Sequence, residues 1–266
     1  MSAWSAAHGI IARDLARARR QTSRLLGGVA RPFMWLLLIG TGYGAIARID
    51  AGMPYQAYVF PGILVMAALF GGTLTAVSTV YDREFGMLRL MLASPAGAGA
   101  VLAGRAAAAT LVGALQGGIV LLAAPLVLDA SPARYALAAG ALFLVSAMSA
   151  TLGLLVAARL RSVENFAAVI NVLLFPMLFL SGALYPTAGM PPLFRAVARA
   201  NPVTYAVDLV RHALARPAES SVAVAASAVV GATALAFVLT ALLFDPEQRF
   251  TASATAPWAR AGAHRR

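Results

Sequence analysis

The chain has 266 residues, of which 61% are hydrophobic and only 12% are charged, whereas about a quarter of the residues in soluble domains are charged. This composition excludes a soluble enzyme, a disordered tail and a nucleic-acid-binding domain, despite a formal net charge of +11. The sequence contains no cysteine and all 21 basic residues are arginine, which excludes disulfides, thiolate metal sites and catalytic lysine chemistry.

Residues 1–28 have the pattern of a helix with one apolar side and one basic side. The basic side carries four arginines at helical spacing: Arg13, Arg17, Arg20 and Arg24. We expect this helix to lie in the membrane interface. Two roles fit the pattern: the helix orients the first crossing through anionic lipid, or it also moves and touches a cytoplasmic partner.

Long uncharged runs predict membrane crossings, because a charged residue at the bilayer centre costs about 2.5–3.5 kcal/mol and a crossing takes about 20 residues. Six runs predict helices at 32–49, 56–80, 101–128, 135–158, 165–184 and 221–244. The predicted fold is therefore all-α, a single transmembrane domain over 1–266 with a six-span core at 29–244 and a tail at 245–266.

Six crossings place both ends of the chain on the same side of the membrane. If that side is the cytoplasm, 15 of the 21 arginines lie inside and six lie outside, in agreement with the positive-inside rule. Because the chain is rich in Ala and Gly and its basic residues are all Arg, a bacterial genome is indicated. We therefore expect the bacterial cytoplasmic (inner) membrane, with both termini cytoplasmic.

The loop at 82–104 is the longest predicted cytoplasmic segment between crossings. We expect Asp82 to cap a short helix over 83–92, which Ser94-Pro95 would end. Phe85, Leu88 and Leu92 would share one face of that helix. It could lie on lipid, or it could be the docking element for a soluble protein.

On the outside, residues 187–214 predict a helical hairpin. Asn201 is expected to cap its second helix, with Pro202 at the first helical position. Asp208 and Arg211 are three residues apart and can pair. Such a hairpin could re-enter the bilayer only where protein buries it.

Within the predicted crossings, Gln116 and Asn171 are the notable polar residues. Each could form an interhelical hydrogen bond or line a substrate path. The uncharged runs contain no Asp or Glu, which argues against an ion pump. Because the three histidines are scattered, the sequence predicts no metal site, and it predicts no catalytic residues.

Two stretches resemble the type-2 ATP-binding-cassette (ABC) exporter permeases. The first comprises residues 81–89, with Ser94-Pro95 and then Gly104-Arg105 further along the chain. The second runs from Phe175-Pro176 through 201–211. Both lie at the topological positions that this family uses, namely after the second span and from the fifth span into the outer loop. Together with the six crossings, the resemblance covers nearly the whole chain.

The resemblance implies a homodimeric permease that sits on two copies of a separate ABC ATPase, which binds ATP and Mg while this chain binds no cofactor. The segment 83–93 would be the coupling helix that contacts the ATPase, through Asp82, Arg83, Glu84, Phe85, Met87, Leu88 and Arg89. The outer hairpin, with Asn201, Pro202, Tyr205, Asp208 and Arg211, would be the re-entrant pair that closes the exit side. The segment 83–85 carries one glutamate where many relatives have more acidic residues.

The function implied is export of an amphiphile, such as a drug or a lipid-linked saccharide, across the cytoplasmic membrane. One alternative is a secondary transporter or channel that works without an ATPase; buried Asp or Glu residues within the uncharged runs, or an inverted repeat, would indicate it, and the sequence has neither. A membrane-embedded lipid-modifying enzyme is a weaker alternative, because Asp82/Glu84 and Asp208/His212 have no metal-binding or nucleophilic neighbour in the sequence.

Overall fold

The structure is a computed structural model that describes residues 3–42, 53–92, 97–160 and 162–243. Every regular element within these ranges is helical, so the predicted all-α class is confirmed. The elements are α1 (Ala3–Arg20), α2 (Thr22–Gly42), α3 (Tyr55–Thr75), α4 (Val77–Glu84), α5 (Met87–Leu92), α6 (Gly97–Leu121), η2 (Ala124–Leu126), α7 (Pro132–Arg159), α8 (Val163–Phe179), η3 (Thr187–Gly189), α9 (Pro192–Ala200), α10 (Pro202–Ala213) and α11 (Val222–Leu243).

The bundle is organised around α3, which is apolar on all sides. Nearly every residue from Tyr55 to Thr73 is buried, and α3 packs against α2, α6, α7 and α10. A helix that is hydrophobic all round needs neighbours on every side. At the periphery, α8 and α11 turn many apolar side chains outward, for example Val172 and Leu242. Such a surface is stable when hydrocarbon surrounds it, as expected for a membrane protein.

Four helical segments are long and apolar enough to cross a bilayer: Tyr55–Glu84, Gly97–Leu126, Pro132–Arg159 and Val222–Leu243. They correspond to the predicted second, third, fourth and sixth crossings. Two further apolar segments are shorter: Leu26–Gly42 within α2, and α8 itself, Val163–Phe179. Both are near the lower limit of about 17 residues for a span. Residues 43–49 of the predicted first crossing lie outside the described part of the chain.

Glycines set the distance between the central helices. A Cβ on Gly113 of α6 would lie 2.9 Å from the backbone nitrogen of Gly72 and 3.0 Å from the carbonyl oxygen of Ala68, both in α3. Ser149 of α7 donates a hydrogen bond to the Ala68 carbonyl oxygen at 3.1 Å. Small residues therefore let α3, α6 and α7 approach closely enough for polar contacts between helices.

We expect Gly113→Ala to destabilise the bundle by about 1–3 kcal/mol, because the added methyl group must push α6 away from the α3 backbone. Thermal unfolding of the detergent-solubilised chain measures this loss. Gly118→Ala is the matched control on the same helix, since a Cβ there has no neighbour within 4 Å and Ala favours helix. If both variants unfold at the wild-type temperature, the close approach of α3 and α6 does not limit the size of the side chain at position 113.

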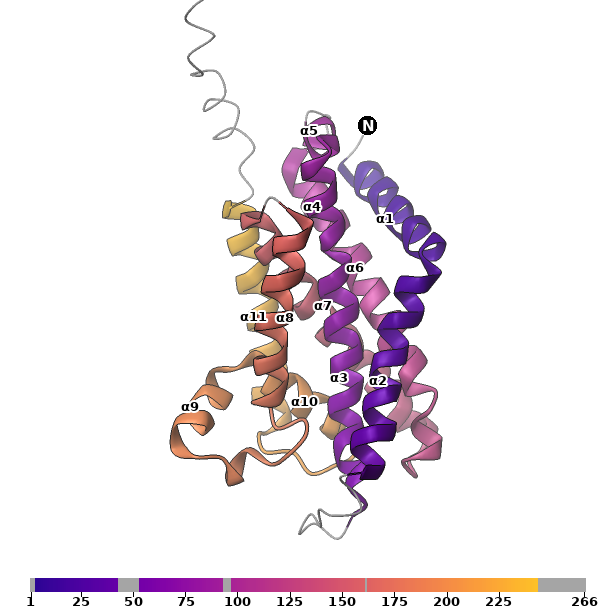
Figure 1. Cartoon of the computed structure of the whole chain (residues 1–266), viewed down its shortest axis with the longest axis vertical. Helices are drawn as coiled ribbons and strands as arrows, with labels where there is room; N and C mark the ends of the chain where they lie inside the picture. The colour runs from indigo at the N-terminus through magenta and orange to yellow at the C-terminus, as the bar shows by residue number, and fades with distance from the viewer. Residues whose placement is uncertain (1–2, 43–52, 93–96, 161, 244–266) are drawn as a thin grey trace, which may run out of the picture.

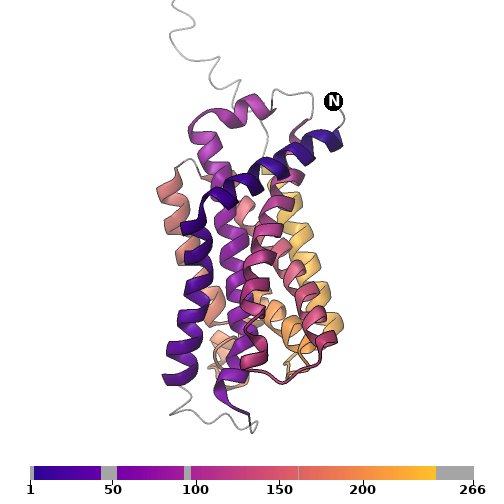
Figure 2. The ribbon, with the colours of Figure 1, turned by 90° about the vertical axis from the view of Figure 1, so that its right-hand side faces the viewer.

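Short helices occupy both ends of the bundle. At one end α1 runs across the spans at a steep angle to α2, and α4 and α5 project beside it (Figures 1 and 2). At the other end lie α9 and α10; α10 packs against α3, α7 and α11, while α9 stands at the edge (Figure 1).

Two boundaries differ from the sequence-based expectation. The N-terminal helix ends at Arg20 instead of continuing to residue 28, so Arg24 belongs to α2. The predicted helix at 83–92 is divided, because α4 continues the second crossing to Glu84 and α5 starts at Met87. Gly86, at a φ of +77°, makes the turn between them, a conformation that glycine adopts without strain.

Candidate functional site

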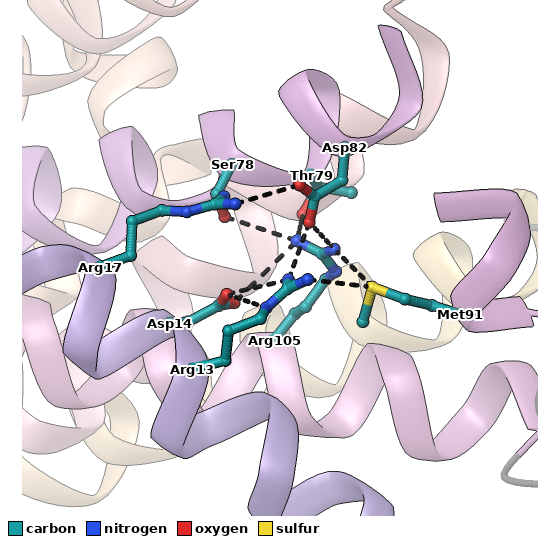
Figure 3. Close-up of polar contacts among 8 residues, drawn as sticks. All are labelled: Arg13, Asp14, Arg17, Ser78, Thr79, Asp82, Met91 and Arg105. Carbon is teal, nitrogen blue, oxygen red and sulfur yellow. Dashed lines mark hydrogen bonds and ion pairs between the residues drawn. The ribbon is translucent and has the colours of Figure 1, made fainter. Parts of the chain in front are cut away.

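Buried charges gather at the end of the bundle where α1, α4, α5 and α6 meet (Figure 3). The carboxylate of Asp82 accepts hydrogen bonds from Arg13 at 2.8 Å, Arg17 at 3.3 Å and Arg105 at 2.5 Å. Asp14 accepts from Arg13 at 3.0 Å. We call these five residues, Arg13, Asp14, Arg17, Asp82 and Arg105, the arginine–aspartate cluster.

Arg105 is the deepest cation of the cluster, with only 1% of its side chain exposed. Besides Asp82 it reaches the hydroxyl groups of Ser78 at 3.4 Å and Thr79 at 3.2 Å. A buried guanidinium is tolerated only when it is paired and hydrogen-bonded. The cluster therefore fastens α6 and α1 to the end of the second crossing.

The same charges stabilise the positive form of Arg13. Burial alone would lower the pKa of Arg13, but the nearby carboxylates of Asp14 and Asp82 outweigh it and raise the pKa above its ordinary value.

Beyond the cluster, four residues around the α4–α5 turn form an exposed tip: Tyr81, Glu84, Phe85 and Met87. Phe85 is 73% exposed, and its ring stacks on that of Tyr81 with centroids 6.3 Å apart. Exposed aromatic and methionine side chains are enriched at protein–protein interfaces.

The exposed tip is anchored on two sides. Arg83 donates to the carbonyl oxygens of Ala157 at 2.5 Å and Leu160 at 2.7 Å, at the C-terminus of α7, where free carbonyls and the helix dipole attract a cation. Leu88 of α5 is buried with Ile10, Val101 and Ala158. Displacement of the exposed tip would therefore be transmitted to α7, α1 and α6.

These contacts change how the predicted coupling residues are understood. Glu84, Phe85 and Met87 face outward, but Asp82 and Leu88 are buried and Arg83 is half-buried against α7. Asp82 does not cap a helix, since it lies within α4. The side chain of Arg89 lies outside what the structure describes.

The predicted basic face of the N-terminal helix is also divided. Arg13 and Arg17 turn toward Asp82, whereas Arg20 is exposed at the end of α1. The side chain of Arg24 lies outside the described part. The reason is Asp82, whose buried charge attracts two arginines that periodicity alone would assign to the interface.

At the opposite end, two local contacts predicted for the hairpin are present, the Asn201 cap and the Asp208–Arg211 pair. The Asn201 side chain accepts from the Val203 amide at 3.0 Å, with Pro202 at the first helical position, so this cap is confirmed. Asp208 and Arg211 pair at 3.7 Å. Tyr205 donates to the Arg199 carbonyl oxygen at 2.8 Å and so connects α10 to α9.

Asp208 and Arg211 also hold α10 to two crossings. Asp208 accepts from the backbone amide and the hydroxyl of Ser220, at 2.8 and 2.6 Å, just before α11. The Arg211 guanidinium lies 4.5 Å from the centre of the Tyr58 ring of α3 and donates to the Gly182 carbonyl oxygen at 2.8 Å. Buried polar groups of α10 are therefore satisfied by protein.

The two polar residues of the predicted crossings have different surroundings. Gln116 is buried where α6 faces α2 and α3, and its Oε1 accepts no hydrogen bond from the described residues. Asn171 is exposed on α8 and donates to the Ala167 carbonyl oxygen of its own helix at 2.9 Å. Among the described residues, the expected interhelical hydrogen bond is therefore seen at neither Gln116 nor Asn171.

Sequence reasoning did not assign a role to Arg105 or Asp14. Both carried a signal, because Arg105 is a charge within a predicted crossing and Asp14 is an acid among the arginines of the N-terminal helix. Pairing them required distances between helices that lie far apart in the chain. Among the described residues, no group of three His, Cys, Asp or Glu side chains could hold a metal.

An apolar helical bundle with four segments long enough to cross a bilayer defines the class as a membrane protein. Residues 7–215 match the ABC-2 type transporter family, and the chain belongs to it. Nodulation protein J of Rhizobium leguminosarum bv. trifolii is 30% identical over 201 residues, covering 74% of this chain and 76% of that protein. The ycf38 transport permease of Cyanophora paradoxa is 28% identical over 209 residues, covering 76% and 71%.

Proposed function

We propose that this chain is the membrane-spanning subunit of an ATP-driven exporter. Two copies would form a homodimer, each contacting one copy of a separate ABC ATPase that binds ATP and Mg. The complex would lie in the bacterial inner membrane, with both termini cytoplasmic and six crossings per subunit. An amphiphile, such as a drug or a lipid-linked saccharide, would leave through the dimer.

The exposed tip is the single observation that carries this proposal. Phe85 and Glu84 project from a turn that is fastened by Arg83 to α7 and by the arginine–aspartate cluster to α1 and α6. A helix that only rested on lipid would need no such bracing. A braced turn transmits force, as a permease driven by an external ATPase requires.

In this mechanism the ATPase supplies the chemical step and this chain supplies the mechanical one. Closure of the ATPase dimer would push the exposed tip through Glu84, Phe85 and Met87. Since Asp82 and Arg83 hold the tip to neighbouring helices, the spans would tilt together as rigid bodies. The hairpin α9–α10, as a re-entrant pair, would open or close the exit side.

The absence of native cysteine allows a direct test of orientation. We expect Phe85→Cys to react with a membrane-impermeant maleimide only in inverted vesicles. Tyr185→Cys, an exposed aromatic position at the other end of the bundle, is the control and should react only in intact spheroplasts. Labelling of Phe85→Cys from outside would place the exposed tip beyond the reach of any cytoplasmic ATPase.

Association is tested by co-purifying the chain with the ABC ATPase encoded nearest to its gene and weighing the complex by native mass spectrometry. The proposal requires two copies of each subunit. Transport by the purified chain alone, driven by an ion gradient, would instead favour the secondary transporter.

A further inference from the structure

A cleft opens between α1, α2, α3 and α6, beside the arginine–aspartate cluster. Its cavity volume is about 40 Å³, and the cleft is open to the surroundings. Its lining is amphipathic, with Asp14, Arg17, Ser78 and Gln116 among the polar residues and Phe70 and Val112 among the apolar ones. With α1 in the membrane interface, as the sequence predicts, this position would be the depth at which headgroup and hydrocarbon meet.

Gln116 contributes an unsatisfied acceptor to this cleft. The residue is only 4% exposed, and its Oε1 is buried without a hydrogen-bond partner among the described residues. A buried acceptor left without a donor is unfavourable. Two glycines make room for the amide, since a Cβ on Gly28 or on Gly71 would lie 2.6 Å from it. No described donor reaches Gln116 Oε1, although Arg17 and Ser78 line the same cleft.

The neighbouring charges do not balance. The arginine–aspartate cluster contains three arginines and two carboxylates, which leaves one positive charge in excess. Arg105 is enclosed, whereas the Arg17 side chain is 36% exposed and lines the cleft. An anion in the cleft would be attracted to Arg17, whose guanidinium has further donors beyond its bond to Asp82.

We infer that this cleft binds the headgroup of a membrane amphiphile that carries a phosphate diester next to a hydroxyl group. The phosphate lies at Arg17, the hydroxyl hydrogen-bonds to the Gln116 side-chain amide, and the chain of the lipid follows the apolar side chains of Leu74 and Val112. Phosphatidylglycerol has this chemistry, and glycerol 1-phosphate has a related polar part without the acyl chains. The inference requires that the chain lies in a membrane and is independent of the ATPase.

The test compares lipids that differ in a single feature, bound to the purified full chain and measured by native mass spectrometry. Phosphatidylmethanol retains the phosphate diester but has no hydroxyl. We expect phosphatidylglycerol to bind about fivefold more tightly than phosphatidylmethanol, which corresponds to one ordinary hydrogen bond. Phosphatidylcholine, with no net charge and no donor, should bind more weakly than either. Glycerol 1-phosphate should not compete at equal concentration.

Three variants locate the site. Gln116→Leu should abolish the preference for phosphatidylglycerol over phosphatidylmethanol, and Gly28→Ala should do the same by displacing the amide while leaving its chemistry intact. Arg17→Gln should weaken both anionic lipids, and Asp82 would retain Arg13 and Arg105. Asn171→Leu removes an exposed amide on α8 and is the matched control, which should keep the fivefold ratio.

Several results would overturn the inference. Equal binding of the two anionic lipids by the wild type would show that the lipid hydroxyl makes no hydrogen bond in the cleft. A fivefold preference that survives Gln116→Leu would show that the hydroxyl does not bond to Gln116. Competition by glycerol 1-phosphate would show that the ligand is soluble and not a membrane amphiphile. An experimental density map with only an ordered water on Gln116 Oε1 would show that the acceptor needs no headgroup.

Discussion

Phe85→Arg is expected to weaken ATPase binding by about thirtyfold or more, because an exposed aromatic anchor at the centre of an interface commonly contributes at least 2 kcal/mol. Phe85 is the most exposed aromatic of the tip and is stacked on Tyr81. A guanidinium is costly to bury without a partner charge, so it could not replace the aromatic ring in an interface. ATP hydrolysis by the reconstituted complex, with binding measured by co-purification, gives the readout.

Glu84→Arg tests the acidic part of the same surface. We expect a smaller loss than for Phe85→Arg and one that varies with salt concentration, because exposed charge pairs are screened. Phe85→Trp should retain coupling, and Tyr185→Arg introduces the same charge at the opposite end as a control. If both Glu84→Arg and Phe85→Arg leave hydrolysis coupled to transport, the exposed tip is not the docking element, although association with an ATPase could still hold.

Asp82→Asn is expected to lower the free energy of unfolding by about 3–5 kcal/mol, the range for removing one partner from a buried ion pair. Its effect is large because the carboxylate serves three arginines, and Arg105 is almost completely enclosed. Without that carboxylate, Arg105 would retain neutral hydroxyl partners and the distant Asp14, 4.0 Å away. Thermal unfolding in detergent measures the loss.

Glu84→Gln is the matched control, because it neutralises an exposed carboxylate two residues further along the same helix. This control should unfold at the wild-type temperature. We also expect Asp82→Asn to free α1, which limited proteolysis within 3–20 would detect. An Asp82→Asn protein as stable and as protease-resistant as the wild type would show that the cluster does not hold α1 in place.

Much of the architecture was predictable from local patterns. The charge-free runs located the four long apolar helical segments that start with α3, α6, α7 and α11 to within a few residues, because lipid penalises charge at any position along a span. Asn201-Pro202 predicted the start of α10 correctly, since a cap depends only on the residues beside it. Sequence motifs at 81–89 and 175–211 indicated the family, which the match over 7–215 confirms.

The inward or outward direction of individual side chains was not predictable. Periodicity assigned Arg13 and Arg17 to the interface and the resemblance assigned Asp82 to the partner, but all three point toward one another. Likewise, Gln116 and Asn171 are both amide side chains in predicted crossings, but Gln116 is buried and Asn171 is exposed. The sequence by itself determined the apolar surroundings of this protein, its four long helices and its family, because these follow from composition and nearest neighbours. Only the tertiary structure decided which charges meet and which remain exposed, because residues 13, 82 and 105 become neighbours only when α1, α4 and α6 pack together.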